Sequence, residues 1–283
     1  MKLKDLQGIF HKELDAIYGE EEVNSFFNLL IEAYYGFNRI TLVLEPELSI
    51  TKEEQNPIFK ALDDLKHEKP IQYILGETEF FGLPFKVNEN VLIPRPETEE
   101  LVDWVLKDQS TKSDDKLSIL DIGTGSGCIA VSLAKNLPQA KVFALDVSKG
   151  ALKIAQENAK ENNVTVKFIE ASILEQPTVG SQLDIIVSNP PYVRNQEKKE
   201  MKNNVLDNEP HLALFVEDEN PLQFYKAITE FAVHNLKNEG VLYFEINEYL
   251  GNEMIELLSD NNFKNIELKQ DIFKKDRMIK ATK

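Results

Sequence analysis

Cysteine is nearly absent from this chain of 283 residues, which contains only Cys128. A single thiol can form neither a disulfide framework nor a thiolate zinc site. The 4 histidines are scattered without the short spacings of metal ligands, so we predict no metal site. No apolar run reaches the ~18–20 residues that cross a bilayer, and the first residues form an acidic amphipathic stretch rather than a targeting signal. We therefore expect a soluble cytoplasmic protein that does not contact a membrane.

Basic charge is also scarce, because 32 Lys and Arg residues face 48 Asp and Glu residues and leave a net charge of −16. Residues 1–80 alone hold 8 basic and 16 acidic residues. Proteins that bind nucleic acid neutralise its phosphates with a basic face. We therefore predict no direct contact with nucleic acid. The acidic first segment either only keeps the protein soluble or steers it toward a basic protein partner.

The first part of the chain has the apolar periodicity of helices. The spacing predicts helices over residues 3–17 and 23–34, and a third helix that follows Pro57. Pro70, Gly76 and Gly82 then separate short β-prone runs at 72–75, 78–81 and 85–87, which together predict a hairpin. We expect a helical domain over residues 1–70, which recognises the substrate, and a β-hairpin connector over 71–93.

From residue 94 onward, strand and helix patterns alternate. Apolar strands are predicted over 117–121, 141–146, 164–169, 183–188 and 241–246, with helices between them and a terminal strand pair over 263–269 and 277–281. Pro221 is expected to open one of these helices, since proline suits the first helical position. Alternating elements with apolar strands predict a parallel sheet covered on both faces. Residues 94–283 thus form an α/β domain.

A glycine-rich loop follows the first of these strands. Its glycines are Gly123, Gly125 and Gly127, an alternation that lets the backbone turn sharply beside the next helix and leaves room for a ligand. The third glycine is not where the dinucleotide fingerprint requires it, which favours a ligand without a diphosphate. Asp146 ends the next strand and is placed to accept hydrogen bonds from ribose hydroxyls. The pair predicts a nucleoside site similar to the S-adenosylmethionine site of Rossmann-like methyltransferases.

The segment Asn189-Pro190-Pro191-Tyr192 follows the strand over 183–188. Open α/β sheets bind ligands at this edge, so we expect the segment to face the same crevice as the glycine loop. The two prolines leave carbonyl acceptors without N–H donors, while Asn189 adds a side-chain acceptor and Tyr192 an aromatic face. Such a site suits a planar –NH₂ group, whose two hydrogens need two acceptors.

This Asn-Pro-Pro-Tyr segment is the signature of methyltransferases that act on amide or exocyclic amino nitrogens. Along nearly its full length the chain resembles the protein-(glutamine-N5) methyltransferases that modify peptide-chain release factors in translation termination. The helical domain, the hairpin, residues 94–99, the glycine loop, Asp146 and the pair Glu209-Pro210 carry the resemblance. In related ribosomal-protein glutamine methyltransferases the segment before the first core helix typically reads Pro-Arg-Ser-Pro. The Pro-Arg-Pro-Glu-Thr-Glu of residues 94–99 favours the release-factor branch.

The resemblance implies roles for named residues. S-adenosylmethionine would be held by the glycine loop, by the end of the second strand and by the segment after the next one: Gly123, Thr124, Gly125, Ser126, Gly127, Asp146, Ser172, Ile173 and Asn189. Asn189, Pro190, Pro191 and Tyr192 would hold the glutamine of a Gly-Gly-Gln tripeptide, with Asn189, Pro190 and Tyr192 as the catalytic residues. Residues 95–99 would help to close the pocket around the methionine end. We also expect a monomer.

Three positions depart from the family pattern. Ser172 stands where an acid usually lies near the adenine amino group and can accept one hydrogen bond in its place. Residues 216–220 replace a Gly-Gly stretch, and Asn247 replaces the glycine of the usual Glu-Ile-Gly. Three alternatives stay open at this point: a ribosomal-protein glutamine methyltransferase, a DNA amino-group methyltransferase that modifies adenine or cytosine, and a non-catalytic binding module built on a degenerate domain of this type.

For the reaction itself, the sequence predicts placement rather than acid–base chemistry. An amide nitrogen is a poor nucleophile because its lone pair is delocalised into the carbonyl group. The site must therefore hold nitrogen and methyl carbon at near-attack distance, and acceptors at Asn189 and Pro190 would stabilise the positive charge that grows on nitrogen. We expect no dedicated strong base.

Overall fold

The computed structural model describes residues 1–109, 116–180 and 182–283. These residues divide into two compact units, which we call the helical unit (residues 1–76 and 202–208) and the sheet unit (77–201 and 209–283). The division differs from the predicted boundaries in three places, the first of which is that residues 71–76 belong to the helical unit. The hairpin belongs to the sheet unit, and residues 202–208 return to the helical unit, where the Asn208 side-chain Nδ2 donates to the Glu68 carbonyl at 3.3 Å.

The helical unit is built around an antiparallel pair of helices. Helix α1 (Leu3–Tyr18) and α2 (Glu20–Tyr35) are joined by Gly19 alone, whose φ of 85° turns the chain back sharply. Phe10 and Phe27 meet edge to face in the core, with ring centroids 5.3 Å apart. The remaining helices of the described unit are α3 (Arg39–Leu44), α4 (Gln55–Lys66), α5 (Ile71–Leu75) and α9 (Asn203–Leu206).

Three predicted helices of this unit are confirmed, and two details are wrong. Residues 72–75 are helical in α5 rather than extended; two of its residues, Ile71 and Tyr73, are buried, and the helix ends at Gly76, whose backbone is left-handed. A short run of β-prone residues cannot be told from a buried helical turn by periodicity alone. Helix α3 was not predicted, because Ile40, Val43 and Leu44 are exposed and only Leu42 packs against the core, so no apolar stripe marks the helix.

The sheet unit begins with a hairpin and continues as a seven-stranded sheet. Strands β1 (Glu77–Phe80) and β2 (Leu83–Lys86) form the antiparallel hairpin that the sequence predicted. The large sheet has the order β10-β11-β9-β6-β3-β4-β5. Its strands are β3 (Ser118–Ile122), β4 (Lys141–Asp146), β5 (Val166–Glu170), β6 (Leu183–Ser188), β9 (Leu236–Glu245), β10 (Lys264–Gln270) and β11 (Asp276–Thr282).

The order in which the strands are added to the sheet reverses between β3 and β6. Strands β3, β4 and β5 follow one another toward one edge, and β6 then returns to the other side of β3. The pairs β3·β4, β4·β5, β3·β6 and β6·β9 are parallel, as predicted, whereas β11 is antiparallel to both of its neighbours. The predicted parallel sheet is confirmed over these strands, and the predicted terminal strand pair adds β11 in the antiparallel direction, because β10 and β11 are joined by a tight turn and not by a crossover helix.

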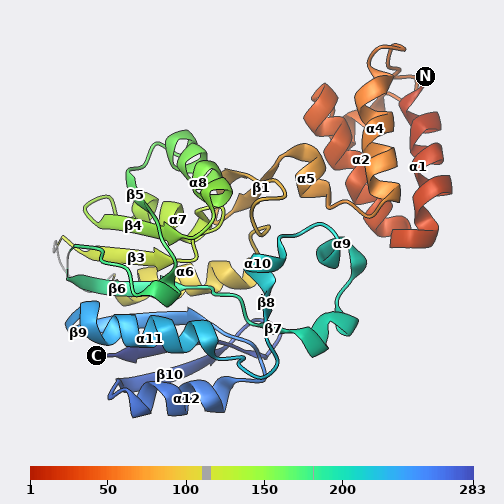
Figure 1. Ribbon diagram of the computed structural model, residues 1–283. Coiled ribbons are helices and arrows are strands. Elements are labelled where there is room, and N and C mark those ends of the chain that lie inside the picture. The colour runs from red at the N-terminus through yellow and green to blue at the C-terminus, as the bar shows by residue number, and fades with distance from the viewer. Residues whose placement is uncertain (110–115, 181) are drawn as a thin grey trace. The chain divides into compact units, whose positions relative to one another are not determined.

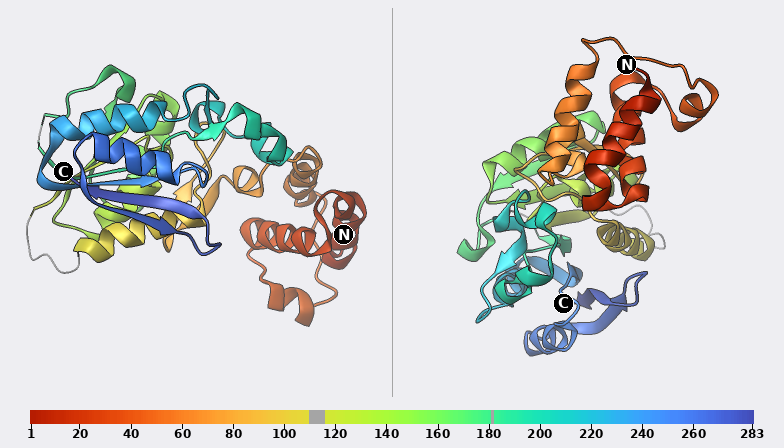
Figure 2. Two further views of the ribbon diagram at one scale, coloured as in Figure 1. Left: turned by 90° about the horizontal axis from the view of Figure 1, so that it is seen from below. Right: turned by 90° about the vertical axis from the view of Figure 1, so that its right-hand side faces the viewer.

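Helices cover both faces of the sheet (Figure 1, Figure 2). Helices α6 (Pro96–Gln109), α7 (Cys128–Asn136) and α8 (Lys149–Glu161) pack on one face; α11 (Gln223–Asn235) and α12 (Gly251–Asp260) pack on the other. Alternate strand residues divide between the two cores: Ile119 faces α6 and α7, whereas Leu120 faces α11 and α12. The prediction of a sheet covered on both faces is confirmed.

Short elements complete the sheet unit. They are the 3₁₀ helices η1 (Ile173–Glu175) and η2 (Asn195–Glu200), the paired strands β7 (Val193–Arg194) and β8 (Phe215–Val216), and helix α10 (His211–Leu214). Helix α11 starts at Gln223, two residues later than the proline rule predicted. No helix in the described part of the chain combines the length and the apolar character that a membrane span requires.

Gly127 combines a left-handed backbone with close packing. Its φ is +81°, and a Cβ there would lie 3.0 Å from the Ala155 Cβ of α8. We predict that Gly127→Ala lowers the free energy of unfolding by about 2–5 kcal/mol, from left-handed strain and overpacking together. Gly180→Ala is the matched control, because φ is +75° and no atom lies near its Cβ position. Urea unfolding should show a smaller loss for Gly180→Ala; equal losses would contradict the packing role of Gly127.

Candidate active site

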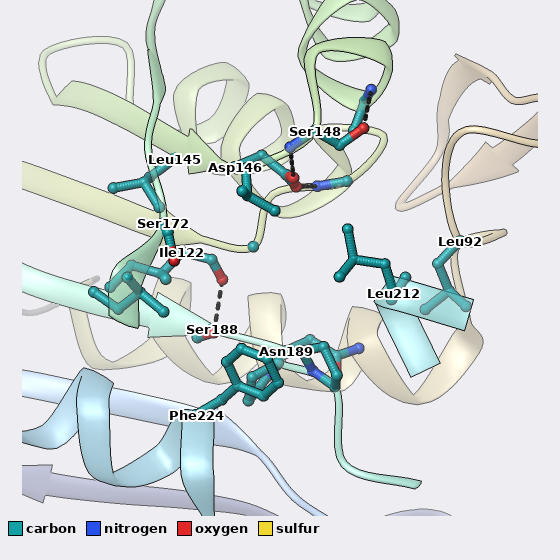
Figure 3. A pocket seen from close by; sticks show the side chains of 18 of the residues that line it. Leu92, Ile122, Leu145, Asp146, Ser148, Ser172, Ser188, Asn189, Leu212 and Phe224 are labelled. Atoms are coloured by element: carbon teal, nitrogen blue, oxygen red, sulfur yellow. Dashed lines mark hydrogen bonds between the residues drawn. The ribbon is translucent and has the colours of Figure 1, made fainter. Parts of the chain in front are cut away.

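The carboxyl ends of β3, β4 and β6 border a deep pocket, which we call the large pocket (Figure 3). It encloses about 880 Å³ of space, counting the part that is open to solvent. In an open α/β sheet this position, where the strand order reverses, is the one that binds ligands. Asp146 and Asn189 lie on opposite sides of the pocket, and Leu92 and Leu212 form part of a third side (Figure 3).

The glycine loop leaves its backbone open to the large pocket. Gly123 and Gly125 both line the pocket, and both have a positive φ, +73° and +54°. A Cβ at Gly125 would meet no atom within 4 Å, and one at Gly123 would meet only the Asn189 carbonyl oxygen, at 4.0 Å. The loop therefore brings bare backbone to the space where a ligand can lie, as the glycine spacing predicted.

The other three residues assigned to this loop do not line the large pocket. The Thr124 hydroxyl donates to Asp121 Oδ2 at 2.6 Å, and the Ser126 carbonyl accepts from the Asn158 side chain at 2.8 Å. Gly127 starts helix α7 against Ala155. These three residues hold the loop in shape through contacts with other parts of the protein. Direct contact of Thr124, Ser126 or Gly127 with a cofactor stays a prediction.

Asp146 is held rigidly at the end of β4. One carboxylate oxygen accepts the Gly125 backbone N–H at 2.9 Å, and the other accepts the Ser148 N–H at 2.8 Å. Burial raises the pKa of Asp146, although these N–H donors oppose the shift. A carboxylate has about four acceptor positions, so two remain for ribose hydroxyls. Asp146 thus ties the glycine loop in place and still offers acceptors to the pocket.

Ser172 and Ile173 line the large pocket beyond the end of β5. The Ser172 hydroxyl accepts from the Leu174 N–H at 3.3 Å as the cap of η1, while Ile173 is buried and gives an apolar wall. Ala171 and Phe224 add further apolar surface. This part of the pocket suits a flat aromatic group such as a purine base.

The Asn189–Tyr192 segment separates the large pocket from a second one of about 320 Å³, which we call the small pocket. Asn189 and Pro190 line both pockets. Pro191 lines only the large pocket and Tyr192 only the small one. The prediction that this segment faces the same crevice as the glycine loop is confirmed, and the segment forms a wall with a ligand space on each side.

Tyr192 is anchored within the protein. Its ring packs against the core beneath α11, and its hydroxyl donates to Glu245 Oε1 at 3.1 Å. Burial, with Glu245 close by, raises the pKa of Tyr192 far above its ordinary value, so its hydroxyl stays protonated. The Asn247 side chain donates to the Tyr192 carbonyl at 3.1 Å, which gives this departure from the family pattern a structural role. That the Tyr192 ring packs on a substrate amide stays a prediction.

Residues 95–99 do not border the large pocket. Arg95 lines the small pocket and forms an ion pair with the buried Glu209. Glu99 accepts the Phe81 N–H at 2.7 Å and so ties the hairpin to α6. Thr98 is buried beneath Asn189. Closure of the pocket by this segment stays a prediction.

Several residues that border the pockets were not predicted. Asn90 and Leu92 come from the segment after the hairpin, and Leu212 comes from α10. Glu245 borders the small pocket from the end of β9. The exposure of Leu212, at 62%, marks an apolar side chain at a pocket rim that a ligand would cover. Nothing in the local sequence indicates that these residues, which come from separate segments, border the pockets.

No group of three or more His, Cys, Asp or Glu side chains in the described residues is arranged to hold a metal ion. Both pockets are lined instead by backbone, apolar side chains and a few polar groups. A nucleoside with a sulfonium side chain fits this set of partners: open glycine backbone, a carboxylate with free acceptor positions and apolar walls. The residues present therefore suit S-adenosylmethionine.

Comparison with known proteins agrees with this fold. The family model of the methyltransferase small domain matches residues 105–213, and that of the PrmC N-terminal domain matches residues 10–76. The solved structure of the hMettl16 catalytic domain covers 77% of this chain and 81% of its own with a TM-score of 0.58, and its 19% identity makes it a likeness of fold alone. The sheet unit is a Rossmann-like, S-adenosylmethionine-dependent methyltransferase domain.

The relatives that match along their full length identify the family more narrowly. The release factor glutamine methyltransferase of Flavobacterium psychrophilum is 58% identical over 99% of this chain and 99% of its own length. That of Bacteroides thetaiotaomicron is 44% identical over 96% and 97%. The chain belongs to the family of release factor glutamine methyltransferases. The resemblance inferred from the sequence motifs is confirmed.

Asp121, below the glycine loop, should make stability depend on pH. Burial raises its pKa to about 7, against the effect of hydrogen bonds from Thr124 and Ala130. In the unfolded chain the carboxyl ionises near 3.8, so the folded protein binds the extra proton and loses stability as pH rises from about 4 to about 7.

We predict that Asp121→Asn removes this loss. The free energy of unfolding of the variant relative to the wild type should rise by more than about 1 kcal/mol between about pH 5 and about pH 8. Urea unfolding at both pH values measures this difference, and other titrating groups cancel between the two proteins. A relative stability that does not change with pH would contradict the assignment.

Proposed function

We propose that this protein transfers a methyl group from S-adenosylmethionine to the side-chain amide nitrogen, N5, of the glutamine in the Gly-Gly-Gln motif of peptide-chain release factors. The relatives that match along their full length are named release factor glutamine methyltransferases. One structural observation carries the proposal: the large and small pockets meet at Asn189 and Pro190. A donor in one and an amide in the other would be neighbours.

The large pocket is the donor site in this proposal. Gly123 and Gly125 would accommodate the cofactor against bare backbone, and Asp146 would accept from its ribose hydroxyls. Ser172 and Ile173 would border its adenine. Bound S-adenosylmethionine supplies an electrophilic methyl group on its sulfonium, so the protein does not have to activate the donor.

The small pocket is the site of the glutamine side chain. Asn189 Oδ1 and the Pro190 carbonyl oxygen would accept the two amide hydrogens, which fixes the plane of the amide. Tyr192 would pack against that plane. These acceptors would also stabilise positive charge on the nitrogen, and they need no reorganisation because prolines hold the backbone. No side chain has to act as a strong base.

The remaining predictions about partner, assembly and location belong to the same proposal. The helical unit would recognise the release factor, and its exposed acidic residues, such as the run over 20–22, suit a basic partner surface. The protein would act as a monomer in the cytoplasm without direct contact with nucleic acid. The net charge of −16 supports the last point, since a duplex would be repelled.

Mass spectrometry tests the proposed function directly. The protein is incubated with methyl-labelled S-adenosylmethionine in three separate reactions. One contains a release factor, one a ribosomal protein preparation and one duplex DNA. We expect the label on the glutamine of the Gly-Gly-Gln motif only. Label on a ribosomal glutamine or on a DNA amino group would replace the proposal with that activity, and no donor binding at all would favour a binding module.

Asn189→Ala removes the acceptor shared by both pockets. We predict a fall in kcat of roughly 10²-fold or more, comparable to the loss of one preorganised transition-state contact, with the Kd for S-adenosylmethionine changed much less. Rates of methyl transfer and calorimetry measure the two quantities. Asn235→Ala on α11 is the matched control, because this asparagine lies outside both pockets. Near-normal turnover of Asn189→Ala would contradict the assigned role.

Asp146→Ala should weaken donor binding. Loss of a charged acceptor, together with loosening of the glycine loop, should raise the Kd for S-adenosylmethionine by roughly 10- to 100-fold. Asp184→Ala is a matched control: its carboxylate accepts the Ser118 N–H at 2.8 Å near the opposite ends of the strands. Its loss should affect stability but not affinity. Calorimetry that finds equal affinity in the wild type and Asp146→Ala would remove Asp146 from the donor site.

A further inference from the structure

Asn189 is the first member of a buried chain of hydrogen bonds. Its side-chain Nδ2 donates to Thr98 Oγ1 at 3.2 Å, and the Thr98 hydroxyl donates to Glu245 Oε2 at 2.6 Å. Tyr192 donates to the other carboxylate oxygen. The members come from α6, from the end of β9 and from the segment after β6, so only the folded sheet brings them together. Thr98 and Glu245 are 2% and 1% exposed.

This chain of hydrogen bonds has a fixed direction. A carboxylate can only accept, and a hydroxyl has one hydrogen. Thr98 gives that hydrogen to Glu245, so toward Asn189 it can only accept. The Asn189 amide must therefore turn its NH₂ group to Thr98, which leaves Oδ1 as the acceptor that the side chain offers to the pockets. An inverted amide would place Oδ1 against an oxygen with no hydrogen to give.

The charged form of Glu245 is what sets this direction. Burial raises the pKa of Glu245, whereas the hydrogen bonds that its carboxylate accepts from Thr98 and Tyr192 and the nearby Arg277 guanidinium oppose this shift. The direction holds while the carboxylate is ionised. A glutamine at this position would have the same shape but would carry a donor on one side. It could then donate to Thr98, whose hydrogen would be free to meet Asn189 Oδ1 and stabilise the inverted amide.

We propose that Thr98 and Glu245 are positioning residues, which hold the Asn189 amide in the one orientation that presents Oδ1 to the substrate amide. The inference deepens the proposed function and rests on it. A substrate –NH₂ group meets an acceptor when Oδ1 faces it, but it meets another –NH₂ group when the amide is inverted. The pair Thr98–Glu245 therefore selects an amino nitrogen as the group that the small pocket accepts.

Kinetics of Thr98 variants test the inference. Thr98→Val keeps the shape but removes the hydroxyl, and we expect kcat to fall about tenfold while the Kd for S-adenosylmethionine changes less than about twofold. Thr98→Ser restores the hydroxyl and should recover most of kcat. Thr229→Val is the matched control, because Thr229 is fully buried and its hydroxyl has no hydrogen-bond partner among the described residues. It should leave kcat unchanged.

A double-mutant cycle separates positioning from general damage. If Thr98 acts through Asn189, Thr98→Val should change kcat less than about twofold when Asn189 is already alanine. An effect as large in that background as in the wild type would overturn the inference, as would normal turnover of Thr98→Val or a failure of Thr98→Ser to recover.

A second measurement needs no activity and no cofactor. In the ¹⁵N-labelled protein alone, the side-chain NH₂ resonances of Asn189 should show a nuclear Overhauser contact to the Thr98 side chain. Glu245→Gln should weaken this contact and shift the resonances, since the inverted amide becomes populated. Unchanged resonances would overturn the inference. Because this readout does not depend on methyl transfer, it separates failure of the inference from failure of the proposed function, which wild-type activity on a release factor decides.

Discussion

The parallel pairing of β3 with β6 is the constraint on which the rest of the site depends. It places Asp121 opposite Val187 and Ile122 opposite Ser188, and the Ser188 hydroxyl donates to the Ile122 carbonyl at 2.6 Å. The two strands therefore end together, and the glycine loop and Asn189 leave the sheet side by side. Gly123 and Asn189 are neighbours, since a Cβ at Gly123 would be in ordinary contact, at 4.0 Å, with the Asn189 carbonyl oxygen. The large pocket and the small pocket are thus neighbours because two strands are in register.

Around this pairing, polar side chains hold neighbouring backbone and hydroxyl groups in fixed orientations. Asp146 ties the Gly125 and Ser148 backbones, Asn247 ties the Tyr192 carbonyl, and Glu245 ties the hydroxyls of Thr98 and Tyr192. Each of these contacts fixes the direction of a donor or acceptor rather than supplying a proton. Such an arrangement suits a reaction whose difficulty lies in holding a weak nucleophile.

The parts of the site that could be predicted from sequence are those encoded within a few residues. The glycine alternation at 123–127 and the Asn-Pro-Pro-Tyr segment each set a local backbone, and apolar strands before them placed both at the same edge of the sheet. Thr98 and Glu245 could not be predicted in the same way, because they are 147 residues apart and meet only through the packing of α6 on β9. The same limit applies to Leu92 and Leu212 at the pocket rim, and to the antiparallel β11. The prediction of an extended run at 72–75 was wrong for a different reason, since Tyr73 is buried by tertiary contacts that override local preference.

In the proposed reaction a substrate amide lies edge-on against Asn189, beside the donor. A crystal structure of the protein with S-adenosylhomocysteine and a peptide that contains Gly-Gly-Gln tests this most directly. We expect the glutamine side-chain nitrogen to lie about 3 Å from both Asn189 Oδ1 and the Pro190 carbonyl oxygen, within hydrogen-bonding distance. A glutamine bound elsewhere, or an Asn189 amide that turns its NH₂ group toward the peptide, would contradict it.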